Sequence, residues 1–328
     1  VGPVSQGNEN LEWEKLWSSN LAFRLGFWDR VNVEIEFYNK KTTNMLMSVP
    51  QSYSGGRGGF LRDNVGAMVN RGVEFNVSGD VIRTKDFVWS VNANASYNKN
   101  EITELYNGLN EYVTGTTATK LMVGHSYGEF CLNRFAGVNP ANGDPLWYNK
   151  DGELTTEFRE ADKVMIGKSC IAPWQGGFGT SLAYKGISLT AQFSWVAKRW
   201  MMNNDRFFEE GGGIFDSYNQ SKRMLYDRWK KPGDITDIPR HGTTPQFDTH
   251  LLENASFMRL KNLMVSYSLP QEWLKKAYIF SSARVYVQGQ NLLTFTGFSG
   301  LDPESDANIY KVQYPMSRQF MFGIDVTF

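Results

Sequence analysis

Hydrophobic and polar residues alternate along most of this chain with a period of two, which is the spacing of a β-strand. The run 89–98 is the clearest, because every second residue is apolar or aromatic and those between are polar: Ser90, Asn92, Asn94, Ser96 and Asn98. The same alternation recurs at 31–38, 73–78, 187–195 and 319–328. Helical spacing is confined to short pieces such as 220–230. The pattern predicts an all-β protein.

Eleven strands are predicted, and their connections alternate between short and long. The strands lie near 16–27, 29–40, 70–82, 86–98, 116–123, 127–138, 174–184, 187–202, 255–269, 280–295 and 317–328. The long connections are 41–69, 99–115, 139–173, 203–254 and 296–316. Long loops on one rim and short turns on the other are typical of an antiparallel transmembrane β-barrel. A soluble β-sandwich, the alternative, has shorter strands and mixed loops at both ends.

The two faces of these strands suit lipid on one side and water on the other. If the apolar face contacts lipid, the opposite face directs amide and carboxylate side chains into a lumen: Glu34, Glu36, Glu74, Asn92, Asn94, Gln192 and Gln319. A lumen of this composition holds water or a polar plug rather than a dry core. In the last strand, the lipid-facing set is Phe320, Phe322, Ile324 and Val326, and the lumen set is Gln319, Met321, Gly323, Asp325 and Thr327.

Composition removes several other classes of protein. The 34 Lys and Arg residues equal the 34 Asp and Glu residues, so the chain lacks the basic excess of a nucleic-acid-binding protein. No apolar run approaches 18 residues, which excludes membrane-spanning helices. An aromatic content of 14% argues against a disordered chain.

Motifs for covalent chemistry are absent, so no enzyme activity and no cofactor are expected. The stretch Gly167-Lys168-Ser169 resembles the end of a phosphate-binding loop, but Asp162 stands where that motif needs a glycine. The three histidines lie in connections without the spacing of zinc ligands. Loop carboxylates offer calcium sites or, alternatively, solvated acidic loops: Glu209, Glu210, Asp302, Glu304 and Asp306.

The two cysteines lie on neighbouring segments around the long connection 139–173. Cys131 and Cys170 permit a disulfide at the base of this connection if the protein is exported to an oxidising compartment. Two free thiols are the alternative, because sequence does not reveal the distance between the two residues.

Five segments carry a family resemblance. They read NVGAMVNRGVEF at 64–75, FAGVNPANGDPLWY at 135–148, ASFMRLKNLMVSYSLP at 255–270, QNLLTFTGFSGLDPE at 290–304 and YPMSRQFMFGIDVTF at 314–328. In this order they resemble the C-terminal half of a SusC/RagA-type TonB-dependent outer-membrane transporter of the Bacteroidetes. The resemblance covers essentially the whole chain, 1–328.

The resemblance implies a fold, a location and a set of partners. The chain would supply about eleven strands of an outer-membrane barrel of about 22 strands, with the plug domain absent from it. The implied partners are the remaining half of the transporter, the TonB complex acting through that missing part, a SusD-like surface lipoprotein, and a second such complex in a dimer.

The resemblance also implies active import of an oligomeric nutrient. A glycan oligosaccharide is the first expectation. A peptide, as for RagA-type importers, or a siderophore or cobalamin is the alternative within transport. A secreted β-rich glycan-binding or adhesion protein and an extracellular glycan hydrolase are the rivals from other classes.

Candidate ligand-binding residues are aromatic and charged side chains in the long connections. Aromatic faces beside amide and acidic side chains are suited to sugars, and the connection 139–173 and the segment 199–218 offer candidates: Trp147, Tyr148, Arg199, Trp200, Asp205, Arg206, Phe207, Phe208 and Tyr218. Contact with the lipoprotein, or packing of the loops on themselves, is the alternative role for this set.

Overall fold

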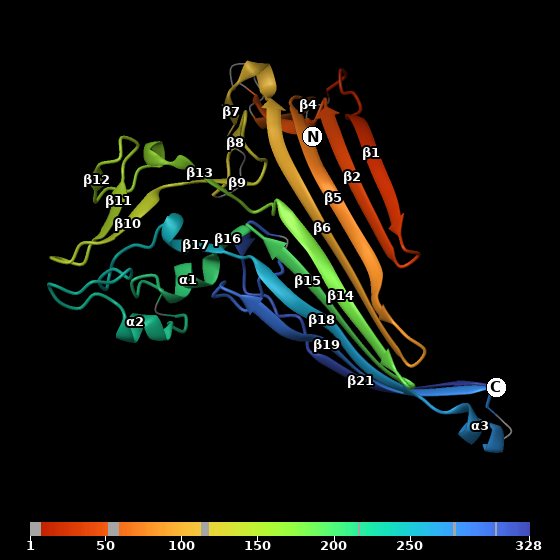
Figure 1. Cartoon of the computed structure of the whole chain (residues 1–328). Coiled ribbons are helices and arrows are strands. Elements are labelled where there is room, and N and C mark those ends of the chain that lie inside the picture. Colours follow the sequence, from red (N-terminus) through yellow and green to blue (C-terminus); the bar gives the residue numbers. More distant parts are fainter. Residues whose placement is uncertain (1–7, 52–58, 113–117, 216, 278–279, 306) are drawn as a thin grey trace, which may run out of the picture.

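One continuous antiparallel sheet forms the body of the protein (Figure 1). The computed structural model describes residues 8–51, 59–112, 118–215, 217–277, 280–305 and 307–328. The nine sheet strands pair in chain order: β1 (Lys15–Phe27), β2 (Val31–Thr43), β5 (Ala67–Arg83), β6 (Phe87–Glu104), β14 (Trp174–Tyr184), β15 (Ile187–Ala197), β18 (Phe257–Ser268), β19 (Ser282–Thr296) and β21 (Gln319–Thr327). Within the described part of the chain the sheet is open, with β1 and β21 at its edges.

Short turns gather at one end of the sheet and long connections at the other (Figure 1). Trp28 and Asp29 join β1 to β2 with φ angles of 54° and 52°, and Lys185 and Gly186 join β14 to β15 with φ angles of 44° and 87°. Paired positive φ angles are those of a type I′ turn, whose twist matches that of the strands it joins. The helix α3 (Gln271–Ala277) lies in the longest connection at this end.

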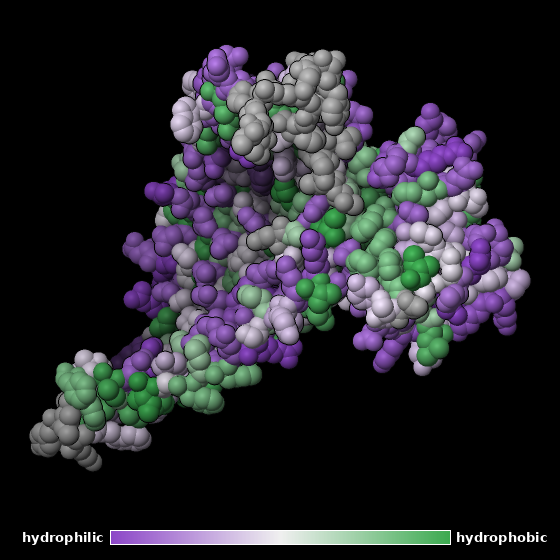
Figure 2. All heavy atoms as spheres, turned by 180° about the vertical axis from the view of Figure 1, so that it is seen from behind, coloured by the Kyte–Doolittle hydropathy of each residue, from purple (hydrophilic) through white to green (hydrophobic). Residues whose placement is uncertain are grey.

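The long connections form a separate set of small elements, called here the rim. Its strands are β3 (Leu46–Gln51), β4 (Gly59–Asn64), β7 (Glu111–Tyr112), β8 (Leu121–Met122), β9 (Glu129–Leu132), β10 (Arg134–Val138), β11 (Pro145–Tyr148), β12 (Leu154–Thr155), β13 (Val164–Ser169), β16 (Trp200–Asn203), β17 (Leu252–Asn254) and β20 (Ile309–Tyr310). Its helices are η2 (Tyr106–Gly108), η3 (Glu160–Asp162), α1 (Asn204–Glu209), α2 (Lys222–Tyr226) and η4 (Thr249–Leu251). Figure 2 shows hydrophilic side chains along the outer edge of the rim and apolar ones gathered near α3.

The predicted count of eleven sheet strands is wrong, because two of them belong to the rim. In the predicted strand 127–138, β9 pairs with β13 and β10 pairs with β11. In 116–123, β8 pairs with β7, and residues 116–117 lie outside the described residues. Their apolar residues serve a different core: Phe130 and Leu132 are fully buried and pack with Met202 and Leu251. Connections 99–115 and 139–173 are therefore parts of one excursion between β6 and β14.

The register of the sheet separates a polar face from an apolar one. Glu34 faces Asn76 across β2 and β5, and Asn76 in turn faces Asn94 across β5 and β6. On the other face, Phe322 and Ile324 are 81% and 71% exposed, as expected for side chains that contact lipid. Among the described residues, none of the helices combines the length and the apolar character needed to cross a membrane.

We expect an arginine to be tolerated on one face of β21 and not on the other. Phe322→Arg places a charge on the apolar face in the middle of the strand, which costs about 2–4 kcal/mol in a bilayer. Met321→Arg is the matched control, because Met321 pairs with Gln288 on the polar face. The measurement is the yield of heat-modifiable, membrane-inserted protein. Equal loss of assembly in both variants would contradict the assignment of faces.

Candidate functional site

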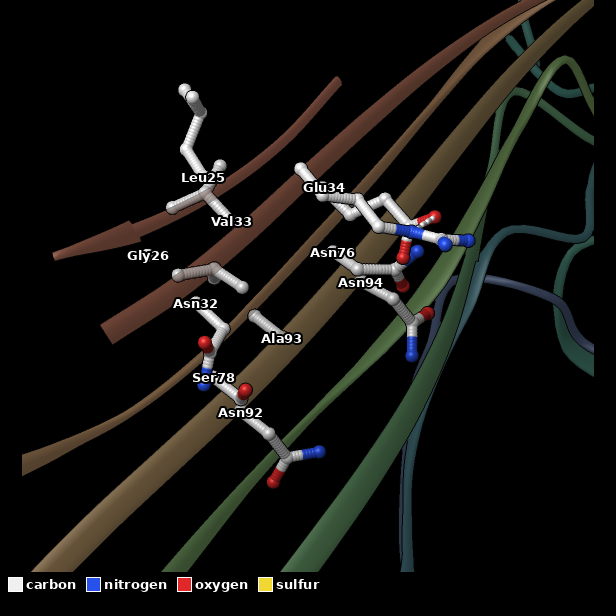
Figure 3. A pocket seen from close by; sticks show the side chains of 12 residues that line it. Leu25, Gly26, Asn32, Val33, Glu34, Asn76, Ser78, Asn92, Ala93 and Asn94 are labelled. Atoms are coloured by element: carbon white, nitrogen blue, oxygen red, sulfur yellow. Dashed lines mark hydrogen bonds and ion pairs between the residues drawn. The ribbon is translucent and has the colours of Figure 1, made fainter. Parts of the chain in front are cut away.

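The polar face of the sheet bears a cavity of about 400 Å³ lined by side chains from four strands (Figure 3). Arg24 donates from Nε to Oε1 of Glu34 at 2.9 Å, so the charged pair lies within this lining. The remaining polar side chains of the lining are amides and hydroxyls: Asn32, Asn76, Ser78, Asn92 and Asn94. This surface offers many hydrogen-bond donors and acceptors with little net charge. It suits a hydrated passage for a polar solute.

Closer to the rim, amide groups bond to one another across the sheet. The Tyr38 hydroxyl donates to Oδ1 of Asn98 at 2.9 Å, and Asn98 and Asn100 both donate to Asn70. A glycine makes this possible, because a Cβ at Gly72 would clash with the Tyr38 ring. The tyrosine ring therefore covers a strand position that lacks a side chain, which fixes the register at this height.

In the rim, the helix α1 begins at a buried asparagine. The Asn203 side chain is 1% exposed and accepts hydrogen bonds from the backbone N–H groups of Asp205 and Arg206, which caps the helix. Its amide nitrogen donates to the Ser299 hydroxyl at 2.9 Å and to Glu253 at 3.2 Å. One side chain thus joins the 203–254 connection to the 296–316 connection.

A chain of charged groups holds the 203–254 connection together. Arg206 binds Glu253 at 3.1 Å and Glu210 at 3.0 Å, and Arg223 binds Glu210 at 2.9 Å and Asp237 at 2.6 Å. The Glu210 side chain is only 4% exposed. The nearby His250 and Arg223 hold the pKa of Asp237 well below its usual value, although burial opposes this. Within this network Glu210 and Arg206 are largely buried, whereas Arg223 and Asp237 are partly exposed.

A second cavity, of about 630 Å³, lies between α1 and the 297–312 segment. Asp205 and Glu209 both line it, and neither forms an ion pair with a basic residue among those described. Burial raises the pKa of both carboxyl groups, and the neighbouring Asp205 and Glu210 raise that of Glu209 further. The cavity therefore presents two uncompensated carboxylates that suit ammonium, guanidinium or amide N–H donors.

Most of the predicted aromatic candidates pack inside the rim. Trp147 is 5% exposed and donates from Nε1 to Asp248 at 2.6 Å. Phe207 stacks on Phe247 with ring centroids 4.4 Å apart and meets Phe208 edge-on. For these residues the contacts therefore fit packing of the loops on themselves, which is the alternative to ligand binding.

Of the remaining predicted ligand-binding residues, some pack against other side chains and others are exposed to solvent. Lys168 Nζ lies 3.6 Å from the centre of the Trp200 ring, and Arg199 donates to the Pro303 carbonyl. Tyr148 and Tyr218 are exposed at 37% and 56%. Among the predicted ligand-binding residues, Asp205 and Arg206 line the cavity of about 630 Å³ beside α1, which is called here the acidic cavity.

Both cysteines are free thiols in the structure. Cys131 pairs with Met165 across β9 and β13, whereas the Cys170 N–H donates to the Gly128 carbonyl. Gly128 directly precedes β9 and is three positions from Cys131, roughly 10 Å along an extended chain. A disulfide requires Cα atoms within about 7 Å, so this geometry does not allow the bond.

Three of the predicted calcium ligands, Glu210, Asp302 and Glu304, bind arginines, whereas Glu209 has no ion pair among the described residues. Glu210 pairs with two arginines, as described above, and Asp302 and Glu304 pair with Arg259. Asp306 lies outside the described residues. Within those described, no group of three or more His, Cys, Asp or Glu side chains is arranged to hold a metal ion.

A buried ion pair that the sequence does not reveal fastens the 296–316 connection to the sheet. Arg259 on β18 is 3% exposed and donates to Asp302 at 2.5 Å and to Glu304 at 2.8 Å. Asp302 also accepts hydrogen bonds from the backbone N–H groups of Met316 and Glu304. Burial opposes ionisation, but these amide groups and Arg259 hold the pKa of Asp302 below its usual value.

Asp302→Asn should release this connection from the sheet. Breaking a buried pair costs about 3–5 kcal/mol. Because the pKa of Asp302 is lowered on folding, its stabilising effect is present above the usual carboxyl pKa of about 3.9 and is lost as the pH falls. Limited proteolysis should show faster cleavage within 296–316 in the variant and, in the parent, on acidification.

Asp144→Asn is the matched control for this substitution. Asp144 binds Arg240 at 2.7 Å, but both side chains are partly exposed, so its loss should cost less than about 1 kcal/mol. Equal protection of the 296–316 connection in both variants would show that the Arg259 pair does not hold it.

Comparisons with known proteins agree on one family. Residues 1–292 match the family described as "TonB dependent receptor-like, beta-barrel". The TonB-dependent receptor P3 of Formosa agariphila is 28% identical over 98% of this chain and 35% of the receptor. The TonB-dependent receptor SusC of Bacteroides thetaiotaomicron is 26% identical over 98% of this chain and 32% of that protein.

Solved structures give a closer match. The RagAB peptide transporter superposes on all of this chain with a TM-score of 0.92 and 39% identity, over 37% of that chain. The RagAB peptide importer in its open-open state gives a TM-score of 0.91 and 40% identity, over 36% of its chain. This chain therefore spans about a third of the length of these relatives.

The matches in sequence and in structure both cover the sheet and the rim. The predicted resemblance is confirmed, and so is the outer-membrane location. The chain belongs to the TonB-dependent receptor β-barrel family, with SusC- and RagA-type receptors as its relatives.

Proposed function

We propose that this chain forms part of an outer-membrane importer that takes up an oligomeric nutrient with energy supplied through TonB. The observation that carries the proposal is the match of the whole chain to the RagAB peptide transporter at a TM-score of 0.92. The polar lining of the sheet, with its cavity of about 400 Å³, supports a hydrated route for the solute. Strands outside this chain would pair with β1 and β21 and close the barrel, since open edges in lipid leave backbone groups unsatisfied.

A peptide is the substrate class that we favour over the glycan expected from sequence. The RagAB proteins, which are described as peptide transporters or importers, are 38–40% identical to this chain, whereas SusC is 26% identical. The acidic cavity supports this choice, because Asp205 and Glu209 suit the N–H donors and basic groups of a peptide. A glycan is the second candidate, supported by the exposed rings of Tyr148 and Tyr218.

The rim is the proposed contact surface of a SusD-like surface lipoprotein. The connections 203–254 and 296–316 are joined through Asn203 and Ser299, so they would present one continuous surface to the partner. Their length also favours a functional role, because long ordered loops in compact domains usually carry function. Segments outside this chain would contact TonB. The chain is proposed to carry out no covalent chemistry.

Removing the two cavity carboxylates should weaken peptide binding. The double variant Asp205→Asn, Glu209→Gln keeps the size of both side chains and removes two negative charges. We expect at least about tenfold weaker binding of basic peptides, because each lost charge-assisted hydrogen bond costs about 1.5–3 kcal/mol. The measurement is isothermal titration calorimetry of the full-length receptor with its lipoprotein, using a peptide mixture of defined charge.

Glu272→Gln, in α3 at the opposite end of the sheet, is the control for this experiment. It should bind peptides like the parent protein. If oligosaccharides bind and peptides do not, the substrate class is wrong while the transport function stands. If neither class is bound or taken up by the parent protein, the proposed function itself is wrong.

A further inference from the structure

On the lipid-facing side of the sheet, apolar side chains are followed directly by charged side chains near the rim. Tyr97 is the last apolar position of β6 on this face, and it lies opposite Val73 on β5 and Trp174 on β14. The next pair towards the rim is Arg71 opposite Lys99. Beyond it, Lys41 and Glu101 flank Val69 in a single row across β2, β5 and β6. Two rows of charge therefore border the apolar surface directly.

The opposed Arg71 and Lys99 are unfavourable for the isolated sheet. Side chains directly opposite each other have Cβ atoms about 5 Å apart, and like charges in this position destabilise the pair. Neighbouring side chains of the protein relieve the repulsion between Arg71 and Lys99 only in part. Arg71 donates to Asn39 at 3.1 Å, which leaves its charge in place, and Lys99 binds Glu101 at 2.7 Å. Lys41 has no ion pair among the described residues, so three cations face one carboxylate.

The depth of this basic group on the membrane surface follows from its aromatic neighbours. The Tyr97 and Trp174 rings pack together with centroids 4.7 Å apart. Aromatic side chains at the edge of the apolar band mark the membrane–water interface of an outer-membrane barrel. Arg71 and Lys99 are one row further out, on the side of the long connections, and the Lys99 side chain is 62% exposed. This is the level of the headgroups of the outer leaflet.

Further lysines extend the positive surface around the end of β14. Lys99, Lys168 and Lys198 line a single cavity of about 520 Å³ together with Tyr97, Pro173 and Glu129, whose carboxylate binds His125 and the Gly167 N–H. Neither Lys168 nor Lys198 forms an ion pair with an acidic residue in the described ranges. The cavity adjoins the basic row, so a headgroup bound by Lys99 would have space beside it.

We propose that Lys41, Arg71 and Lys99 bind the phosphate group of a glycolipid in the outer leaflet. A phosphate matches the local charge, because three cations and Glu101 leave a net charge of +2. The planar guanidinium of Arg71 and the ammonium of Lys99 are both suited to phosphate oxygens. A bound phosphate also removes the repulsion between the opposed pair. The lipid becomes part of the interface between the receptor and its membrane.

The test compares lipid retention by the full-length protein and its variants. The probe is lipid A, with enzymatically dephosphorylated lipid A as the reference, and retention is measured by native mass spectrometry from detergent. Arg71→Gln and Lys99→Gln should each weaken binding of the phosphorylated lipid about tenfold, the equivalent of one charge-assisted hydrogen bond. Lys40→Gln is the matched control, because Lys40 lies at the same height on the opposite face, over the Tyr38 ring.

A fourth variant separates binding from folding. Glu101→Gln removes the carboxylate that competes for Lys99, so it should strengthen retention of the phosphorylated lipid, which a folding defect would not do. Equal retention of the two lipids by the parent protein would overturn the proposal, as would equal effects of Lys40→Gln and Lys99→Gln. If inorganic phosphate protects the protein from heat as well as lipid A does, the site binds free phosphate and the lipid assignment is wrong.

Discussion

The antiparallel ladder between neighbouring strands is the constraint on which the rest of this structure depends. Each strand pairs with the one before it in the sheet, and the register carries every second residue to the same face. Glu34, Asn76 and Asn94 therefore lie side by side although more than fifteen residues separate each from the next. A shift of one residue would place this polar row against lipid, so the sequence of each strand must agree with that of its neighbours.

The rim follows a different principle, because it has its own small cores and its own ionic network. Phe130, Leu132 and Met202 are fully buried there, away from the sheet faces. The buried carboxylate of Glu210 is held by two arginines. The ion pair between Arg259 on β18 and Asp302 fastens the rim to the sheet.

The features of the fold that can be predicted from the sequence are those that depend on the local alternation of hydrophobic and polar residues. The alternation in β6 and β21 predicts which residues face lipid and which face the lumen, because a period of two is typical of a strand whose two faces have different surroundings. The alternation at 127–138 predicts a strand of the sheet, because a buried rim strand has the same period. The links from Asn203 to Ser299 and from Arg259 to Asp302 join residues 96 and 43 positions apart, and no local pattern reports such pairs. The burial of Trp147 is not visible in the sequence for the same reason, since its partner Asp248 is 101 positions away.

The central claim is that the sheet separates lipid from a hydrated lumen, and labelling of single cysteines tests it most directly. Cys131 and Cys170 would first be replaced by serine, and a cysteine would then be placed at Asn94 or at Ala95 in the middle of β6. With the full-length protein in native membranes, a membrane-impermeant maleimide should label position 94 and leave position 95 unmodified. Labelling of position 95 with protection of position 94 would show that the two faces are reversed and would contradict the account.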